Sequence, residues 1–200
     1  MTISQVDQTR HSLTGGISAA WRTAVFIDYD NVKLRGNVFL GPGQVIEAVR
    51  RDLGPAVVVQ FGNLYVGMGL PEDPVPVDRG KIHQIYTSGM APIPTPSFKG
   101  SGTERVKNIA DESALVDIIS TIYTHPEINS YGVVTCDKHF VPAVRELRRN
   151  GKAVRIYYRG QIATVLADEI RWLIGDGFSS AVDLETLPYL TQIQSEIGST

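Results

Sequence analysis

Two carboxylates and an amide follow directly after an apolar run near the start of the chain. The stretch AVFIDYDNVKL contains Asp28, Asp30 and Asn31 within four positions. Further along, Asp111 lies in KNIADESALVD, and Asp137 ends the run YGVVTCD. Clustered carboxylates repel one another and are costly to desolvate, so they persist where cations or hydrogen bonds compensate. If the fold brings these groups together, their oxygens suit a hard divalent cation such as Mg²⁺ or Mn²⁺.

Such a cation has a defined chemistry. Held by carboxylates, it can activate water and neutralise charge on a phosphodiester under in-line attack. A lone Asp at a strand end is more often a turn or helix cap, and Asn31 could equally be a cap. The metal interpretation therefore depends on whether Asp28, Asp111 and Asp137 converge.

The elements that must position these residues are strands alternating with helices. Continuous apolar runs predict strands at 23–28, 56–67, 130–137 and 152–160. Helical spacing and terminal signals predict helices at 42–54, 104–125, 140–151 and 161–175. This order predicts an α/β fold with a mainly parallel central sheet and helices on both faces.

In such a sheet, ligands bind at the carboxyl ends of the strands. Asp28 and Asp137 end two predicted strands, and Asp111 lies near the start of the helix before the second of them. A crossover helix begins at the edge where strands end. The topology alone therefore predicts that the three carboxylates share one rim.

Length and composition predict an ordinary globular protein. The 200 residues are 42% hydrophobic and 20% charged, and the net charge of -2 argues against a global attraction to nucleic acid. Cys136 is the only cysteine, so no internal disulfide can form. Because no apolar stretch approaches the ~20 residues that cross a bilayer, and the polar start lacks a signal peptide, we expect a cytoplasmic protein without membrane contact.

We expect one folded domain at 21–175, preceded by a flexible arm at 1–20 and followed by a C-terminal extension at 176–200. The segment 68–102 is rich in proline and glycine. Within it we predict a short helix at 81–89 and a strand at 90–94, and then a mobile loop.

The segments that carry these carboxylates resemble the successive motifs of the NYN domains, in the LabA-like branch of the PIN-like ribonucleases. The family's first motif, an apolar strand followed by Asp, two residues and Asn, is matched by Asp28 and Asn31. Its middle motif has Lys and Asp before an apolar helix with a second Asp, and it is matched by Lys107, Asp111 and Asp117. The resemblance runs from about residue 23 to about residue 173.

The third motif departs from the family pattern. In TCDKHFVP, Asp137 fills the first acidic place, whereas His139 stands where the family usually has a second acid. His139 could donate to phosphate or bind a softer ion such as Mn²⁺, and Glu112 could partly replace the lost acid. The alternative is a protein of the same fold that binds RNA or acts as a scaffold with little or no catalysis.

The resemblance implies a three-layer, Rossmann-like PIN-like fold and a divalent-metal-dependent endoribonuclease. Asp28, Asp111 and Asp137 are then expected to hold Mg²⁺ or Mn²⁺, and Asn31 to orient a ligand or contact phosphate. Additional site residues are Asp117 and His139, and the residues expected to bind the RNA are Lys107, Lys138 and Arg105. Lys107 lies one helical turn before Asp111 if both belong to the predicted helix. A homodimer formed through the last helix or the tail is a further expectation.

Two other chemistries fit parts of the sequence. DYDNV matches the aspartate signature of haloacid dehalogenase-like phosphatases, which would also need Thr135 and Lys152 at the site. Cys136 could act as a nucleophile, although a packing role is commoner for a lone cysteine. The basic run RELRRNGK could track RNA or could simply form a solvated helix face.

Overall fold

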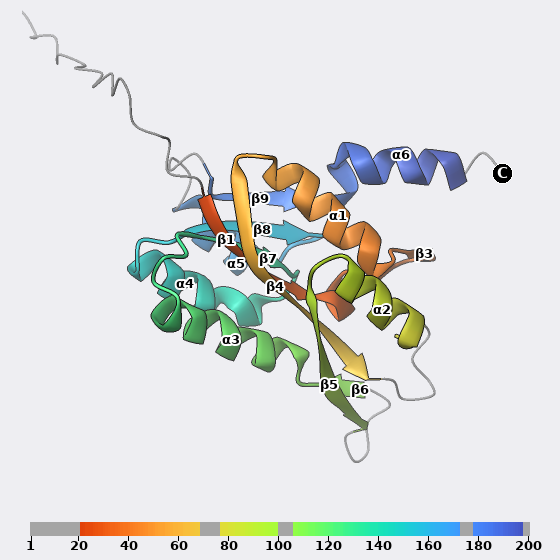
Figure 1. Cartoon of the computed structure of the whole chain (residues 1–200), viewed down its shortest axis with the longest axis horizontal. Coiled ribbons are helices and arrows are strands. Elements are labelled where there is room, and N and C mark those ends of the chain that lie inside the picture. Colours follow the sequence, from red (N-terminus) through yellow and green to blue (C-terminus); the bar gives the residue numbers. More distant parts are fainter. Residues whose placement is uncertain (1–20, 69–76, 100–105, 173–177, 198–200) are drawn as a thin grey trace, which may run out of the picture.

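The computed structural model describes residues 21–68, 77–99, 106–172 and 178–197, and the expected arm at 1–20 lies outside them (Figure 1). Its centre is a seven-stranded sheet in the order β6-β5-β4-β1-β7-β8-β9. Every pairing in it is parallel except that of β5 with β6, as predicted for a mainly parallel sheet. The strands are β1 (Trp21–Asp28), β4 (Val57–Met68), β5 (Ala91–Lys99), β6 (Val106–Asn108), β7 (Ser130–Val134), β8 (Ala153–Tyr158) and β9 (Ser180–Asp183), beside a separate hairpin of β2 (Leu34–Arg35) and β3 (Val38–Phe39).

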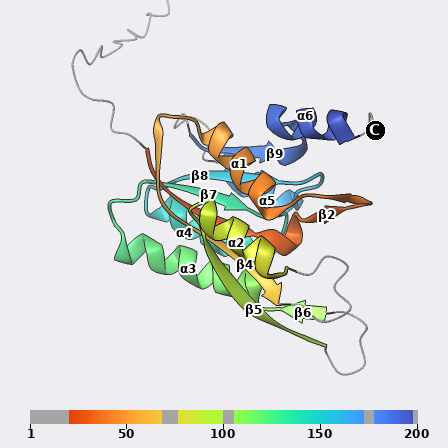
Figure 2. The same ribbon diagram turned by 45° about the vertical axis from the view of Figure 1, so that its right-hand side comes forward.

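Helices cover both faces of the sheet and give the predicted three layers (Figure 2). One face carries α1 (Pro42–Leu53), α2 (Arg79–Thr87) and α6 (Pro188–Ile197). The other carries α3 (Ala110–Thr124), α4 (Val141–Arg149) and α5 (Thr164–Arg171). Single turns of 3-10 helix lie at η1 (Tyr29–Asn31), η2 (Lys138–Phe140) and η3 (Leu184–Thr186).

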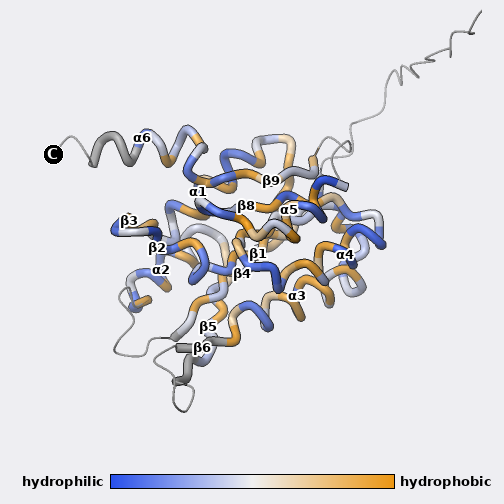
Figure 3. The backbone as a smooth tube through the Cα atoms, turned by 180° about the vertical axis from the view of Figure 1, so that it is seen from behind, coloured by the Kyte–Doolittle hydropathy of each residue, from blue (hydrophilic) through white to orange (hydrophobic). Residues whose placement is uncertain are grey.

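The central strand β1 is buried on both sides. Val25 and Ile27 pack into the layer of α1, whereas Ala24 and Phe26 pack into the layer of α3. This alternation follows from the two-residue period of a strand, and it explains the unbroken apolar run. Hydrophobic residues accordingly gather along the central strands and α3 (Figure 3).

Helix α3 is shorter than the helix predicted at 104–125. Residues 106–108 form β6 instead, which pairs antiparallel with 97–99. The buried face of α3 contains Ala114, Ile118 and Ile122, whereas Val116 is 65% exposed.

Part of the expected mobile loop is a strand. β5 continues to Lys99, beyond the strand predicted at 90–94, and contains Pro92, Pro94 and Pro96. Proline has no N–H to donate, so it is tolerated in a strand where one edge is open. β6 pairs with 97–99, and no other strand in the described part of the chain pairs with the outer edge of β5 at the three prolines. Residues 100–105 lie outside the described part of the chain.

The chain changes direction across the sheet at β1. β4 lies on one side of β1, and β7 lies on the other. In open α/β sheets, such a switch point opens a crevice at the carboxyl ends of the strands. Asp28 is the last residue of β1, and Asp137 is the third residue after the end of β7.

The segment expected as a C-terminal extension, 176–200, adds one strand and one helix to the layers of the fold. β9 pairs with β8, and α6 packs on the face that carries α1. None of the helices in the described ranges has the length and apolar character needed to span a membrane.

Candidate metal centre

Three possible metal ligands meet at the switch point. Asp111 comes from the first turn of α3, and Asp137 and His139 come from the turn after β7. One ligand atom from each of the three lies within 4.8 Å of the others. Two carboxylate oxygens and an imidazole nitrogen form a donor set that fits a divalent cation. The residues present therefore suit a divalent cation; the group contains Asp111 and Asp137 of the expected ligands, with His139 in place of Asp28.

Asp28 lies beside this group but is more deeply buried. The two-residue period of β1 puts Asp28 on the same side of the sheet as Ala24 and Phe26, which is the side of α3, and the residue is 2% exposed. The Asn31 amide donates a hydrogen bond to Asp28 Oδ2, and the Thr135 hydroxyl lies 3.4 Å from the same oxygen. The backbone N–H of Asp137 donates to Thr135 Oγ1 at 3.1 Å. Thr135 thus connects Asp28 to the turn that carries Asp137.

The pKa of the Asp28 carboxyl is raised from 3.8 to about 7, and burial is the largest cause; the value already includes the effects of the neighbouring groups. Among these, the nearby charges of Asp30 and Asp111 raise the pKa, while hydrogen bonds from Asn31 and Thr135 lower it. A cation beside Asp28 would favour the ionised form. The metal-free site therefore has one carboxyl that keeps its proton to a higher pH than an ordinary aspartate does.

Glu112 also lies close to the three ligands. A hydrogen bond with Asp111 is the main cause that raises the pKa of the Glu112 carboxyl, and the charge of His139 lowers that pKa. Glu112 is exposed at the mouth of the site. It is adjacent to Asp111 in sequence, yet their side chains approach each other, so it remains a candidate to replace the missing family acid.

The family model of the NYN domain matches residues 22–171, which is most of the chain. The chain belongs to the NYN domain family. NYN domains are generally nuclease-like and depend on divalent metal ions, and the group of Asp111, Asp137 and His139 is compatible with such a site.

The fold is also found in a solved structure of a protein of unknown function from Vibrio parahaemolyticus. The TM-score is 0.62 at 18% sequence identity, and the match covers 86% of this chain and 98% of that one. At this identity the likeness concerns the fold. No curated protein matches this NYN domain in sequence.

Asp117 lies away from the cluster of Asp111, Asp137 and His139. Its Oδ2 accepts a hydrogen bond of 2.5 Å from the hydroxyl of Tyr65, a buried residue of β4. Asn63 of the same strand lies 3.4 Å from that oxygen. In this NYN domain, Asp117 therefore ties α3 to β4.

Asp30 binds residues other than Asp111, Asp137 and His139. It pairs with Lys33 at 2.7 Å and accepts the backbone N–H of Gly67 at 2.8 Å. These contacts hold the end of β4 against η1, the turn that carries Asn31. Thr135 and Lys33 also support the site, and the sequence motifs did not assign them this role. The signal for Thr135 was its place at the end of a buried strand, directly before Cys136 and Asp137.

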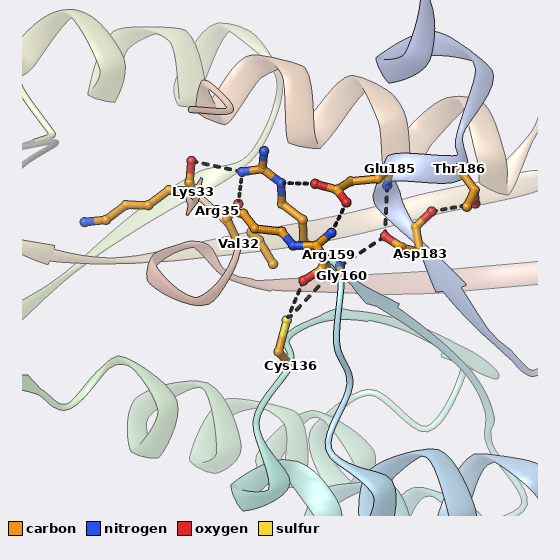
Figure 4. A network of polar contacts seen from close by, with 9 residues as sticks. All are labelled: Val32, Lys33, Arg35, Cys136, Arg159, Gly160, Asp183, Glu185 and Thr186. Carbon is orange, nitrogen blue, oxygen red and sulfur yellow. Dashed lines mark hydrogen bonds and ion pairs between the residues drawn. The ribbon is translucent and has the colours of Figure 1, made fainter. Parts of the chain in front are cut away.

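A buried arginine, Arg159, holds the chain that follows η1 (Figure 4). Arg159 is 4% exposed, and its Nη1 donates to the backbone oxygens of Val32 and Lys33. Its Nε lies 3.2 Å from Glu185, which also pairs with Arg35. The hairpin that follows η1 is thereby fastened to the C-terminal segment.

The residues expected to bind RNA are placed only in part. Lys138 is exposed in η2 beside the cluster. Lys107 lies in β6 and not in α3, so the prediction that it shares a helix face with Asp111 was wrong. Arg105 lies outside the described residues.

The four basic residues of the run RELRRNGK are engaged in structural contacts. Arg145 and Arg148 pair with Glu169, and Arg149 pairs with Glu146. Lys152 Nζ donates to the backbone oxygens of Pro126 and Ile128, at the opposite end of the strands from Asp28. These contacts fit a solvated helix face, and they leave the phosphatase interpretation without its lysine.

Cys136 lies between the site and the Arg159 network. Its sulfur accepts the backbone N–H of Arg159 at 3.4 Å, and burial raises the pKa of the thiol. A raised pKa disfavours the reactive thiolate. The geometry therefore favours the packing role over nucleophilic attack.

Proposed function

We propose that this NYN domain is a divalent-metal-dependent endoribonuclease that hydrolyses RNA phosphodiester bonds. The observation that carries the proposal is the convergence of Asp111, Asp137 and His139 within 4.8 Å at the switch point of the sheet. Asp28 lies beside them at the end of β1. The family's nuclease-like character supports the same chemistry.

In this proposal the chain's residues divide the work. Asp111 and Asp137 hold Mg²⁺ or Mn²⁺ at the mouth of the crevice, and Asp28 contributes a carboxylate from its floor. Asn31 orients Asp28 through its amide. When bound, the cation supplies a Lewis acid that activates water and neutralises phosphate charge. The exposed Lys138 attracts the RNA backbone, since phosphate contacts dominate affinity for nucleic acid.

Other roles in RNA binding follow from the sequence motifs. We assign Lys107 and Arg105 to contacts with the RNA backbone, because both lie just before α3 in the chain. Asp117 acts indirectly, by fixing α3 and hence Asp111. The same proposal includes the LabA-like branch, a cytoplasmic location and a homodimer. Each of these is an expectation from the sequence.

A second candidate function is RNA binding without cleavage. The observation that favours it is His139 in the place of a family acid, because a histidine lowers the negative charge available to a cation. The raised pKa of Asp28 acts in the same direction.

The test is RNA cleavage by purified protein. Labelled single-stranded and structured RNAs are incubated with Mg²⁺, Mn²⁺ or EDTA, using the wild type, Asp28→Asn and Asp111→Asn. The matched control is Asp168→Asn, which removes an exposed carboxylate from α5. We expect metal-dependent cleavage in the wild type and the control only. Retention of RNA on a filter without any cleavage would favour the binding protein, and cleavage by Asp111→Asn would contradict the assigned site.

A further inference from the structure

We propose that His139 is itself a metal ligand and that its nitrogen makes the site select Mn²⁺ over Mg²⁺. This inference rests on the metal site of the proposed function and adds the identity of the ion. It concerns the second acidic position of the third motif, which this chain fills with a histidine.

The ring of His139 is already placed as a ligand would be. Its Nδ1 lies 3.2 Å from Asp137 Oδ2 and 3.4 Å from Asp111 Oδ2. With metal–ligand bonds of about 2.0–2.2 Å, neighbouring ligands of one ion are separated by about 3.0–3.5 Å. Both separations fall in this interval, and ligand atoms of the two carboxylates lie within 4.8 Å of each other, so one ion would contact all three residues once the carboxylates turn toward it.

The backbone of η2 fixes the partners of the ring. The N–H of His139 donates to Asp137 Oδ1 at 2.9 Å, which leaves Oδ2 to face the imidazole. The His139 side chain is 59% exposed, whereas those of Asp111 and Asp137 are 23% and 28% exposed. The nitrogen therefore lies at the open side of the site, where water and substrate can occupy the remaining positions of an ion.

The nitrogen changes which ion is preferred. Mg²⁺ is a hard ion that binds oxygen ligands and retains its waters, whereas first-row transition metals accept imidazole. Exchanging a carboxylate for a neutral imidazole also removes one negative charge from the ligand set. Both changes weaken Mg²⁺ binding, and the second is partly offset for Mn²⁺ by the new metal–nitrogen bond.

Binding and spectroscopy test the inference without any activity measurement. Untagged, metal-free protein is titrated with Mn²⁺ while the EPR signal of the free ion is recorded, and Mg²⁺ is then used as competitor. Pulsed EPR of the Mn²⁺-loaded protein detects nitrogen coupled to the ion. The variants are His139→Asp and Asp111→Asn, and the control is His83→Asp, the same change at an exposed site on α2.

We expect nitrogen coupling in the wild type and in His83→Asp, and its loss in His139→Asp. We also expect the ratio of the Mg²⁺ to the Mn²⁺ dissociation constant to fall about tenfold or more in His139→Asp. Mn²⁺ binding that needs Asp111 but shows no nitrogen coupling would overturn this inference and leave the proposed metal site intact. The absence of Mn²⁺ binding sensitive to Asp111→Asn would overturn both.

Discussion

Replacing Asp28 with Asn should stabilise the metal-free protein at neutral pH, although it removes a residue of the proposed site. The carboxyl is 2% exposed, and its pKa is raised from 3.8 to about 7, first by burial. An asparagine at this position keeps an oxygen that accepts the hydrogen bond from Asn31. When this oxygen takes the place of Asp28 Oδ2, it also accepts from the hydroxyl of Thr135, which lies 3.4 Å from the same atom. The variant thus avoids burying a charge without losing its partners.

The sign and size of the effect follow from proton linkage. Below about pH 4 the carboxyl is protonated in both the folded and the unfolded chain. Between about pH 4 and pH 7 the unfolded chain releases this proton while the folded chain keeps it, so the free energy of unfolding falls as the pH rises. A shift of about three pKa units corresponds to roughly 4 kcal/mol, all of it lost above pH 7. The Asn variant carries no such loss.

Urea denaturation in EDTA, followed by circular dichroism at several pH values, measures this difference. We expect the free energy of unfolding of Asp28→Asn, relative to that of the wild type, to increase by about 3 kcal/mol as the pH rises from about 5 to about 8. Asp168→Asn, which changes an exposed carboxylate, should show no such pH-dependent gain. A constant or shrinking difference across this range for Asp28→Asn would refute the assignment of a raised pKa to Asp28. Adding Mn²⁺ should stabilise the wild type more than Asp28→Asn.

Three further substitutions test the supports of the site. Tyr65→Phe removes the hydrogen bond to Asp117, and we expect a loss of about 1–3 kcal/mol in the free energy of unfolding, measured with urea. Arg159→Met leaves buried backbone oxygens without a donor, so a loss of about 3 kcal/mol is expected in the same assay. Thr135→Val breaks the link from Asp28 to the next turn, and it should weaken Mn²⁺ binding by about tenfold in calorimetry. If the free energy of unfolding or the Mn²⁺ affinity were unchanged in a variant, the structural role assigned to that residue would be wrong.

The architecture was predictable because it follows from local patterns. Residues that are close in sequence determine the buried run of β1, the helical spacing of α1 and the end of α1 at Gly54. The rule for parallel strands then placed Asp28 and Asp137 at the same rim. Each step needed only period, terminal signals and handedness.

What could not be predicted depends on contacts between distant residues. The bond from Tyr65 to Asp117 joins residues that no periodicity relates, and it takes Asp117 away from the metal ligands. The strand β6 forms only because β5 lies beside it, which cut short the predicted helix and moved Lys107 off it. The approach of the His139 ring to Asp111 likewise depends on how η2 packs against α3.

The fate of solvent oxygen during RNA cleavage tests the central claim most directly. Cleavage is carried out with Mn²⁺ in water enriched in heavy oxygen, and the product ends are analysed by mass spectrometry, with Asp111→Asn as the comparison. If water attacks the phosphodiester, each cleavage leaves a linear phosphate that carries one solvent oxygen, and EDTA or Asp111→Asn abolishes the product. A cyclic phosphate without solvent oxygen, formed equally well in EDTA or by Asp111→Asn, would contradict the account.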